Sequence, residues 1–337
     1  CIMALECNRI KCGGYLISKN IMLGVNRETK KNWMMGQLKL RVAENQEVDL
    51  TIFANEFTST GSANKSYQAL KTIKDEYKSL DSTITNKRMN SDAKPEKDEA
   101  TTVGSLEECD FVYANKGIKI SMNHYMRDGQ LNSNFRLSVN FVNRAKETDA
   151  KEPYLEGELI GVVSKVPVVL EDSDGEYLKF ELTVPEYRNA WGDREESIAV
   201  DKFEIVMKKE DFGSDEEFEG AKDFVESEFE ENVVVSTSIV PTVKVVAVEE
   251  ETPTSKRGFG KKVEFTPSTK VVREIRAIGG FPLEEEEYAN DNAFNLELYS
   301  KGVEEYERKL EELKQDQPKD FTAHKGFGKK ASTDLPF

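Results

Sequence analysis

Alternating apolar and polar positions dominate the middle of the chain. Three successive runs are rich in Val, Ile and Phe and are separated by polar segments, as consecutive strands are. In the second run Leu178, Phe180, Leu182 and Val184 share one face while charged and polar residues fill the other, which is the period of a half-buried strand. The pattern predicts strands over residues 159–170, 177–187 and 197–207.

The connections between these runs favour a small barrel or sandwich. Residues 172–175 are a cluster of turn formers that closes a hairpin, whereas 188–196 is long enough for a loop. In the third run the apolar parity changes between Val200 and Phe203, and a straight strand does not place both on one face. We expect a β-bulge there, because bulges bend strands around small barrels.

A second group of strands is predicted in the first 150 residues. Alternation between residues 34 and 57 indicates two strands that flank a turn at 44–46, and residues 15–25 form a candidate first strand. Three further candidate strands cover residues 109–113, 117–125 and 134–142.

Between these strands the apolar positions change to helical spacing. Ser62 is a favourable N-cap, and the helical pattern stops before Asp81. Residues 82–102 are polar and charged, which predicts a mobile loop. The predicted helix buries a stripe made of Tyr67, Leu70, Ile73, Tyr77 and Leu80.

An acidic segment follows the three central strands. Residues 211–231 hold ten acidic residues among 21, yet Phe and Val recur at helical spacing, so we expect an acidic amphipathic helix. A strand at 233–248 and a possible strand at 270–278 come next. The order strand, strand, strand, helix, strand resembles the five-stranded OB barrel, and the first half of the chain roughly repeats it.

The expected architecture is mainly β with a few helices, as tandem OB-like small barrels followed by a flexible acidic C-terminal tail. The first OB-like domain covers residues 1–150 and the second covers 151–283. Residues 284–337 form the tail, with a short surface helix marked by an apolar stripe of Val303, Tyr306, Leu310 and Leu313.

Net charge is −16, but it is distributed unevenly. Residues 1–150 carry 22 basic against 19 acidic side chains, a net of +3, and the remainder carries 25 against 44, a net of −19. A near-neutral half can bind phosphates through one face even when the whole chain is acidic. No run of about 18 apolar residues exists, so the sequence predicts no membrane contact.

The sequence predicts neither an enzyme nor a bound cofactor. It has two histidines, and no serine lies in a nucleophile elbow. Gly-Phe-Gly-Lys lacks the spacing of a phosphate loop. The few cysteines favour a reducing compartment, which we expect to be the cytoplasm. A zinc site would have to use Cys7, Cys12, Cys109 and His124 at loose spacing, and ordinary reduced thiols are favoured.

Aromatic and basic side chains on the polar strand faces and in loops are the candidate binding residues. Single-stranded nucleic acid is held by base stacking and by a basic groove for its phosphates. The alternative is that Phe53 and Phe57 pack under the helix and that the cations only solubilise the protein. The candidate DNA-binding residues are Trp33, Lys39, Arg41, Phe53, Phe57, Lys119, Tyr125, Arg127 and Arg136 in the first domain, and Lys179, Tyr187, Arg188, Trp191 and Arg194 in the second.

Five residues, Gly-Phe-Gly-Lys-Lys, recur at 258–262 and 326–330. Glycines leave the aromatic ring and the lysines free for contact, so both segments could bind nucleic acid or a shared acidic groove. Two flexible linkers with solvated charge are the alternative.

The last four residues carry a family resemblance. Asp334, Leu335, Pro336 and Phe337 resemble the tip of bacterial and phage single-stranded DNA-binding proteins, an acidic tail that ends in an aliphatic residue, Pro and Phe. The resemblance implies OB-fold domains that bind single-stranded DNA and a tip that recruits replication and repair proteins. The family tip is usually more acidic than this one, which has lysines at 329 and 330.

The sequence therefore predicts a protein that coats single-stranded DNA during phage replication or recombination and recruits partners through its C-terminal tip. As a phage protein it would act in the bacterial host cytoplasm. The alternative is a β-rich phage structural protein, or an acidic DNA mimic, that does not bind DNA.

Overall fold

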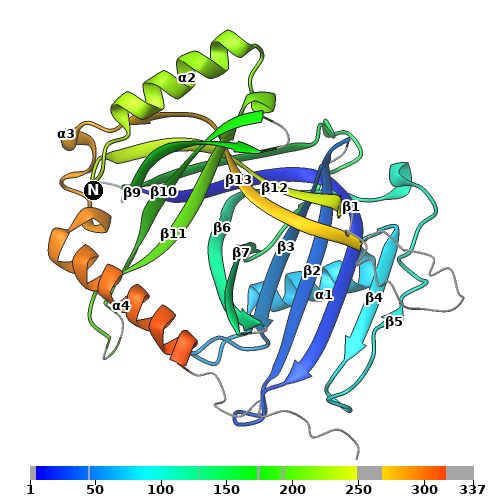
Figure 1. The fold of residues 1–337 in the computed structure, drawn as a ribbon. Coiled ribbons are helices and arrows are strands. Elements are labelled where there is room, and N and C mark those ends of the chain that lie inside the picture. The colour runs from blue at the N-terminus through cyan, green and yellow to red at the C-terminus, as the bar shows by residue number, and fades with distance from the viewer. Residues whose placement is uncertain are drawn as a thin grey trace, which may run out of the picture.

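The computed structural model describes residues 5–44, 46–127, 129–172, 175–190, 192, 194–248 and 268–315 (Figure 1). The described part is mostly β and contains four α-helices, which confirms the mainly β class. None of these helices has the length and apolar character needed to cross a membrane.

Five strands of the first half form a closed circuit. β1 pairs with β2 and β6, β2 pairs with β3, and β6 pairs with β7. The circuit closes where β3 and β7 run parallel at Leu50 and Leu137, both buried. Helix α1 follows β3 and packs on β2 and β3. The bounds are β1 Asn8–Val25, β2 Asn32–Ala43, β3 Gln46–Asn55, α1 Lys65–Glu76, β6 Phe111–Arg127, β7 Gln130–Val139 and the short β8 Asn143–Arg144.

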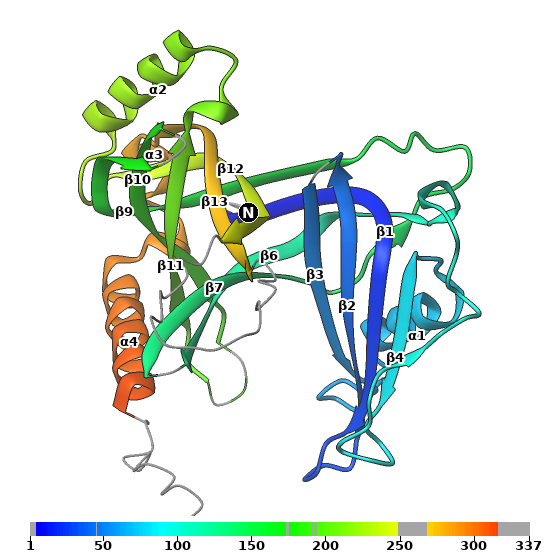
Figure 2. The ribbon, with the colours of Figure 1, turned by 45° about the vertical axis from the view of Figure 1, so that its right-hand side comes forward.

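The second half repeats this connectivity. β9 pairs with β10 and β12, β10 with β11, and β12 with β13. β11 and β13 run parallel at Ile205 and Ile275, and α2 lies between the third and fourth strands in the chain. Figure 2 shows β9–β13 on the left and β1–β3 with α1 on the right. The bounds are β9 Tyr154–Asp172, β10 Gly175–Arg188, β11 Ser197–Lys208, α2 Asp215–Glu228, β12 Val234–Val248 and β13 Ser268–Pro282.

The two circuits are joined by the first strand of each. Residues 8–13 of β1 pair antiparallel with residues 154–159 of β9, and both segments are the first residues of their strands. Asn8 lies opposite Leu159, and Gly13 lies opposite Tyr154. A Cβ at Gly13 would meet the Tyr154 ring, so glycine permits this close pairing. The pairing relates the two circuits by an approximate two-fold axis.

Each circuit also sends its last hairpin toward the other. β6 and β7 pair with each other beyond the residues where β6 pairs with β1, and the extended hairpin contacts β11 and α4 (Leu296–Gln315). β12 contacts β3 in return. Residues of both circuits therefore border the space beside each hairpin.

The segment 82–102 was expected to be a mobile loop, and this is wrong for its first part. β4 (Asp81–Asn86) pairs parallel with β1, and the short β5 (Glu96–Lys97) pairs with β4. Its polar groups are satisfied within the insertion, where the hydroxyls of Ser82 and Thr101 lie 2.9 Å apart.

Buried Lys19 ties this insertion to α1. Its Nζ donates to the backbone oxygens of Ile73 and Lys74, both at 2.9 Å, and lies 4.0 Å from Asp98. The last carbonyls of α1 are thus satisfied by a side chain of β1. Burial lowers the pKa of Lys19 to about 8, with Asp98 opposing the shift.

Two smaller expectations are also corrected. α1 begins at Lys65 and its N-cap is Asn64, whose side chain accepts from the Ser66 amide at 3.0 Å; Ser62 belongs to the preceding turn. Residues 109–113 and 117–125 were expected to be separate strands, but one strand, β6, spans most of both because Gly117 adopts a positive φ of 73° within it.

The bulge expected between Val200 and Phe203 is absent, because β10 and β11 pair in continuous register. Ile198 and Val200 are buried on the opposite face, where α4 packs on β11. At Gly302 of α4 a Cβ would contact the backbone of Ile198 and the side chain of Val200, so the helix lies directly on this strand. A short helix, α3 (Glu285–Tyr288), precedes α4 in the chain.

Candidate nucleic-acid interface

The outer face of the first circuit carries an aromatic pair. Even-numbered positions of β2, such as Met34 and Leu38, are buried, so its odd-numbered positions face outward. Trp33 of β2 and Phe53 of β3 meet on this face, with ring centroids 5.9 Å apart and ring planes inclined by 33°. Phe53 is 56% exposed, so the pair offers an open ring surface.

Glycine on the neighbouring strand makes room for the tryptophan. Gly24 of β1 lies opposite Trp33, and a Cβ there would collide with the indole ring. The indole therefore lies across the backbone of β1, which fixes its position on the face.

Tyr177 occupies the corresponding position in the second circuit. It lies on β10 opposite Leu170 of β9, and Leu170 is 16 residues after the first residue of its strand. Gly24, the partner of Trp33, is also 16 residues after the first residue of β1. The approximate two-fold axis thus relates Trp33 to Tyr177. Lys208 of β11 lies beside Tyr177, with its Nζ 5.4 Å from the ring centroid.

A groove runs between the outer faces of the two circuits. Two cavities of about 410 and 280 Å³ share Asn134, Phe135 and Arg273, so they form one continuous depression. Its first end is lined by Gln37 and Thr51 of β2 and β3. Its second end is lined by the Tyr177 face, including Lys179, Glu204, Val206 and Lys208.

Most cations along this groove are held by carboxylates. Arg273 of β13 reaches Asp49 of β3 at 3.4 Å, and its guanidinium lies 5.9 Å from the centroid of the Phe135 ring. Lys179 pairs with Glu204 at 2.6 Å. Arg136 is exposed in the groove and makes no ion pair with any residue that the structure describes.

Lys208 lies between two acidic groups, Asp172 and Glu274, each at 3.3 Å. Although burial opposes it, the attraction of Glu274 and Asp172 raises the pKa of Lys208. A phosphate that enters the groove must displace the carboxylates that pair with these cations. The positive charge available to bind it is therefore smaller than the number of cations suggests.

The remaining predicted residues of the first half are dispersed. Lys39 and Arg41 both pair with Glu47, at 3.5 and 3.2 Å. Phe57 is exposed beyond β3 and does not pack under α1. Tyr125 and Arg127 lie at the exposed end of β6.

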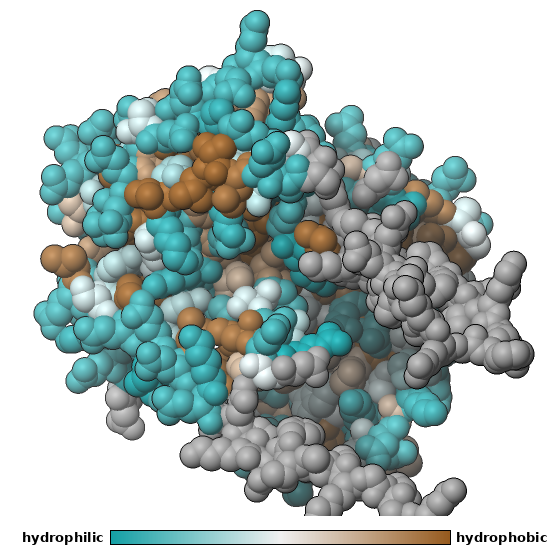
Figure 3. All heavy atoms as spheres, in the orientation of Figure 1, coloured by the Kyte–Doolittle hydropathy of each residue, from teal (hydrophilic) through white to brown (hydrophobic). Residues whose placement is uncertain are grey.

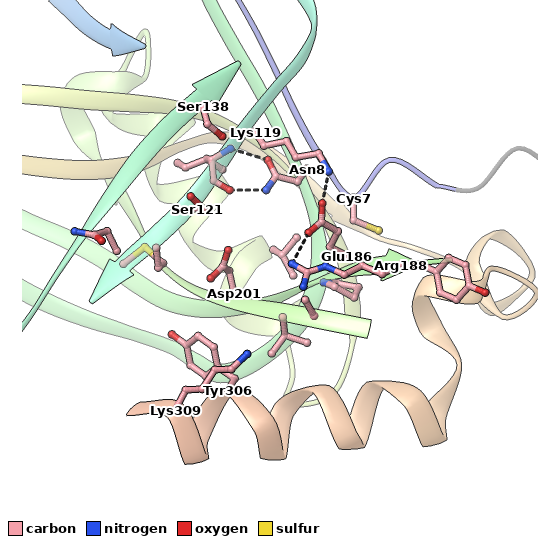
Figure 4. Close-up of a pocket in the computed structure, with 18 of the residues that line it drawn as sticks. Cys7, Asn8, Lys119, Ser121, Ser138, Glu186, Arg188, Asp201, Tyr306 and Lys309 are labelled. Atoms are coloured by element: carbon pink, nitrogen blue, oxygen red, sulfur yellow. Dashed lines mark hydrogen bonds and ion pairs between the residues drawn. The ribbon is translucent and has the colours of Figure 1, made fainter. Parts of the chain in front are cut away.

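Lys119 and Arg188 meet at Glu186, away from the groove (Figure 4). They line a cavity of about 660 Å³ between β6, β10, β11 and α4. Tyr187 donates to Glu196 at 2.6 Å, and Arg194 is exposed in the loop that follows β10. Trp191, the tip Asp334, Leu335, Pro336 and Phe337, and both Gly-Phe-Gly-Lys-Lys segments lie outside the described residues.

The same cavity contains the contact that fixes α4 to the β6–β7 hairpin. The Tyr306 hydroxyl lies 2.9 Å from Nε2 of His124, and Nδ1 of His124 lies 2.7 Å from Oγ of Ser133. Burial lowers the pKa of His124. Asp201 projects into the cavity, and burial raises its pKa to about 6 (Figure 4).

The cysteines do not come together with His124. Cys7, Cys12 and Cys109 are buried free thiols, and the part of the chain that the structure describes holds no cluster of metal-ligating side chains. Burial raises the pKa of both Cys7 and Cys12 to about 12, so these thiols are protonated at neutral pH.

Sequence reasoning missed Tyr177, Lys208 and Arg273. Tyr177 lies on the polar face of a predicted strand, so the alternation could have identified it. Arg273 lies in a strand with no local sign of its contact, because its partner Asp49 is more than two hundred positions earlier in the chain.

Comparison with known proteins identifies the family. The sequence model of the YorF family matches residues 6–316. The chain belongs to the YorF family. No curated protein matches this sequence.

Two solved structures illustrate what this YorF-family chain is similar to. The wild-type single-stranded DNA binding protein from Thermus aquaticus gives a TM-score of 0.42 at 8% identity, over 82% of this chain and 93% of that chain. The Plasmodium falciparum SSB complex with ssDNA gives a TM-score of 0.25 at 15% identity, over 42% of this chain and 100% of that chain.

Proposed function

We propose that this chain binds single-stranded DNA across the outer faces of two OB-like barrels, one within residues 1–150 and one within 151–283. The main support for the proposal is that Trp33 and Tyr177 occupy equivalent positions in the two circuits. OB barrels bind oligonucleotides on the face of their second and third strands. β2–β3 and β10–β11 are those strands here, and each presents an aromatic ring on that face.

Base stacking supplies most of the binding in this scheme. An aromatic ring contributes about 1–3 kcal/mol per stacked base without regard to sequence. The Trp33–Phe53 pair lies on the same strand faces as Gln37 and Thr51, beside the first end of the groove, and would take bases there. Tyr177 would take bases at the other end, with Arg136 and Arg273 between them for phosphates. Because most groove cations are already paired, we expect affinity to fall with salt less steeply than the cation count suggests.

A coating role in phage replication or recombination, in the host cytoplasm, extends the proposal. In it, Asp334, Leu335, Pro336 and Phe337 recruit replication and repair proteins, and the chain is not an enzyme. Deleting these four residues should abolish partner capture and leave oligonucleotide affinity equal or higher.

Fluorescence polarisation with labelled oligo-dT tests the binding face. An oligonucleotide of about 30 nucleotides covers two OB barrels at roughly 4–16 nucleotides each. We expect Trp33→Ala and Tyr177→Ala each to weaken binding roughly 5- to 100-fold, as the loss of one stack requires. Phe224→Ala is the matched control, because Phe224 is an exposed aromatic residue of α2.

Two results would reject this function. One is a wild-type protein that does not bind oligo-dT at low salt, which would favour the β-rich structural or DNA-mimic alternative. The other is an affinity for oligo-dT in Trp33→Ala and Tyr177→Ala that equals that of the wild type and of Phe224→Ala, which would place the DNA elsewhere.

A further inference from the structure

The second half of β9 has an open edge. Residues 165–170 pair with β10 on one side, and no other strand that the structure describes pairs with them. In a strand with one free edge, the outward N–H and C=O groups can pair with another chain.

The corresponding edge of the first circuit is covered. Residues 18–23 of β1 pair with β4, and the approximate two-fold axis places residues 164–169 of β9 at the same position. β4 belongs to an insertion between α1 and β6. The second circuit has α2 followed directly by β12, so it has no such insertion.

The open edge is also apolar. Val166, Val168, Val169 and Leu170 are 47%, 46%, 40% and 38% exposed. Figure 3 shows apolar side chains gathered below α2, over the region of β9 and β10. An apolar strand edge with this exposure normally has a partner, because proteins otherwise protect such edges with charges.

The charges at the ends of this segment indicate which partner fits. Lys165 precedes the apolar run and Glu171 follows it. Lys165 pairs with Glu181 of β10 at 2.6 Å, yet its side chain is 72% exposed. Two copies of the segment in antiparallel pairing would place Lys165 of each copy toward Glu171 of the other and bring the apolar side chains together. Opposite charges across paired strands stabilise that pairing, and like charges oppose it.

We propose that this edge of β9 is an interface between two copies of the chain, which associate by antiparallel pairing of residues 165–171. Pro167 lacks an N–H and removes one hydrogen bond from the ladder. The interface is small, so association is weak and depends on concentration. The proposal does not depend on DNA binding.

Sedimentation velocity from low to high micromolar concentration tests this interface. The wild-type chain should shift from monomer to dimer over this range, and Val168→Lys should stay monomeric, because it places two like charges at the centre of the pairing. Phe141→Lys is the matched control and should dimerise like the wild type, since Phe141 is similarly exposed (51%) but lies beyond β7.

Hydrogen exchange on the wild-type chain locates the contact without any substitution. Within residues 165–171, the amides that point to the open edge should gain protection as concentration rises. Three outcomes would overturn the proposal: a monomer at every concentration, a dimer whose new protection lies elsewhere, or protection of this edge in the monomer, which would mean that a segment of the same chain covers it.

Discussion

Arg273 of β13 pairs with Asp49 of β3 at 3.4 Å, so an ion pair links the last hairpin of the second circuit to the first circuit. Both residues line the groove between the two aromatic faces. The pair neutralises a cation at the position where a phosphate backbone would cross.

Removing this carboxylate should strengthen DNA binding. In Asp49→Asn the guanidinium of Arg273 is free for phosphate, and we expect affinity for oligo-dT at low salt to rise about 3- to 10-fold, with a steeper dependence on salt. Titrations at several salt concentrations measure both quantities. Asp75→Asn on α1 is the control, because Asp75 pairs with Lys74 away from the groove. Unchanged binding by Asp49→Asn would place the phosphates elsewhere.

Gly24 should be required for the position of the Trp33 ring. Gly24→Ala places a methyl group where the indole lies, so we expect weaker oligo-dT binding and a shift in tryptophan emission. The emission is measured in a Trp191→Phe background, which leaves Trp33 as the single tryptophan. Gly220→Ala in α2 is the control, because a Cβ there meets no atom within 4 Å. Equal emission and affinity in both variants would contradict this role.

Lys19→Met should lower the free energy of unfolding by about 1–3 kcal/mol, because it leaves the carbonyls of Ile73 and Lys74 without their donor. The pKa of Lys19 is about 8 in the folded chain against 10.5 ordinarily. Between these values the unfolded chain binds more protons, so this residue's contribution to stability rises with pH.

Urea unfolding at pH 7 and pH 9 measures the effect, and the cost of Lys19→Met should be larger at pH 9. Lys71→Met, at an exposed position of α1, should change stability little at either pH. A cost that is the same at both pH values would show that Lys19 is not desolvated as the structure indicates.

Asp201→Asn should stabilise the protein at pH 7. The pKa of Asp201 is raised by burial to about 6, against 3.8 ordinarily. The folded chain therefore binds more protons than the unfolded chain between pH 3.8 and 6, and stability falls as pH rises through this window. One pKa unit corresponds to about 1.4 kcal/mol, so we expect a gain of roughly 1–2 kcal/mol at pH 7 that disappears near pH 4.

Thermal unfolding of Asp201→Asn at pH 4 and pH 7 checks this gain. The amide oxygen of Asn can still accept from the Met122 backbone, so the fold is preserved. Glu28→Gln, at an exposed loop position, is the control. Destabilisation at pH 7 would mean that the Asp201 charge has a partner that stabilises it.

The sequence by itself determined which residues face outward on the strands that bury one face only. Alternation placed Phe53 on the polar face of its strand. The structure brings its ring against that of Trp33, which lies just before the residues predicted as a strand. Helical spacing likewise predicted α1 and α2, because the burial of one face leaves a periodic record in the residues themselves. The same logic failed at Val200, since a helix from a distant part of the chain buries the second face of that strand.

Tertiary structure alone decided how the strands pair. The joining of β1 to β9, the cover of β1 by β4, the equivalence of Trp33 and Tyr177 and the pairing of Arg273 with Asp49 all depend on register between distant segments. A residue pattern specifies the face of a strand, but the partner of a strand is chosen by the packing of the whole core, which leaves no local periodicity to detect.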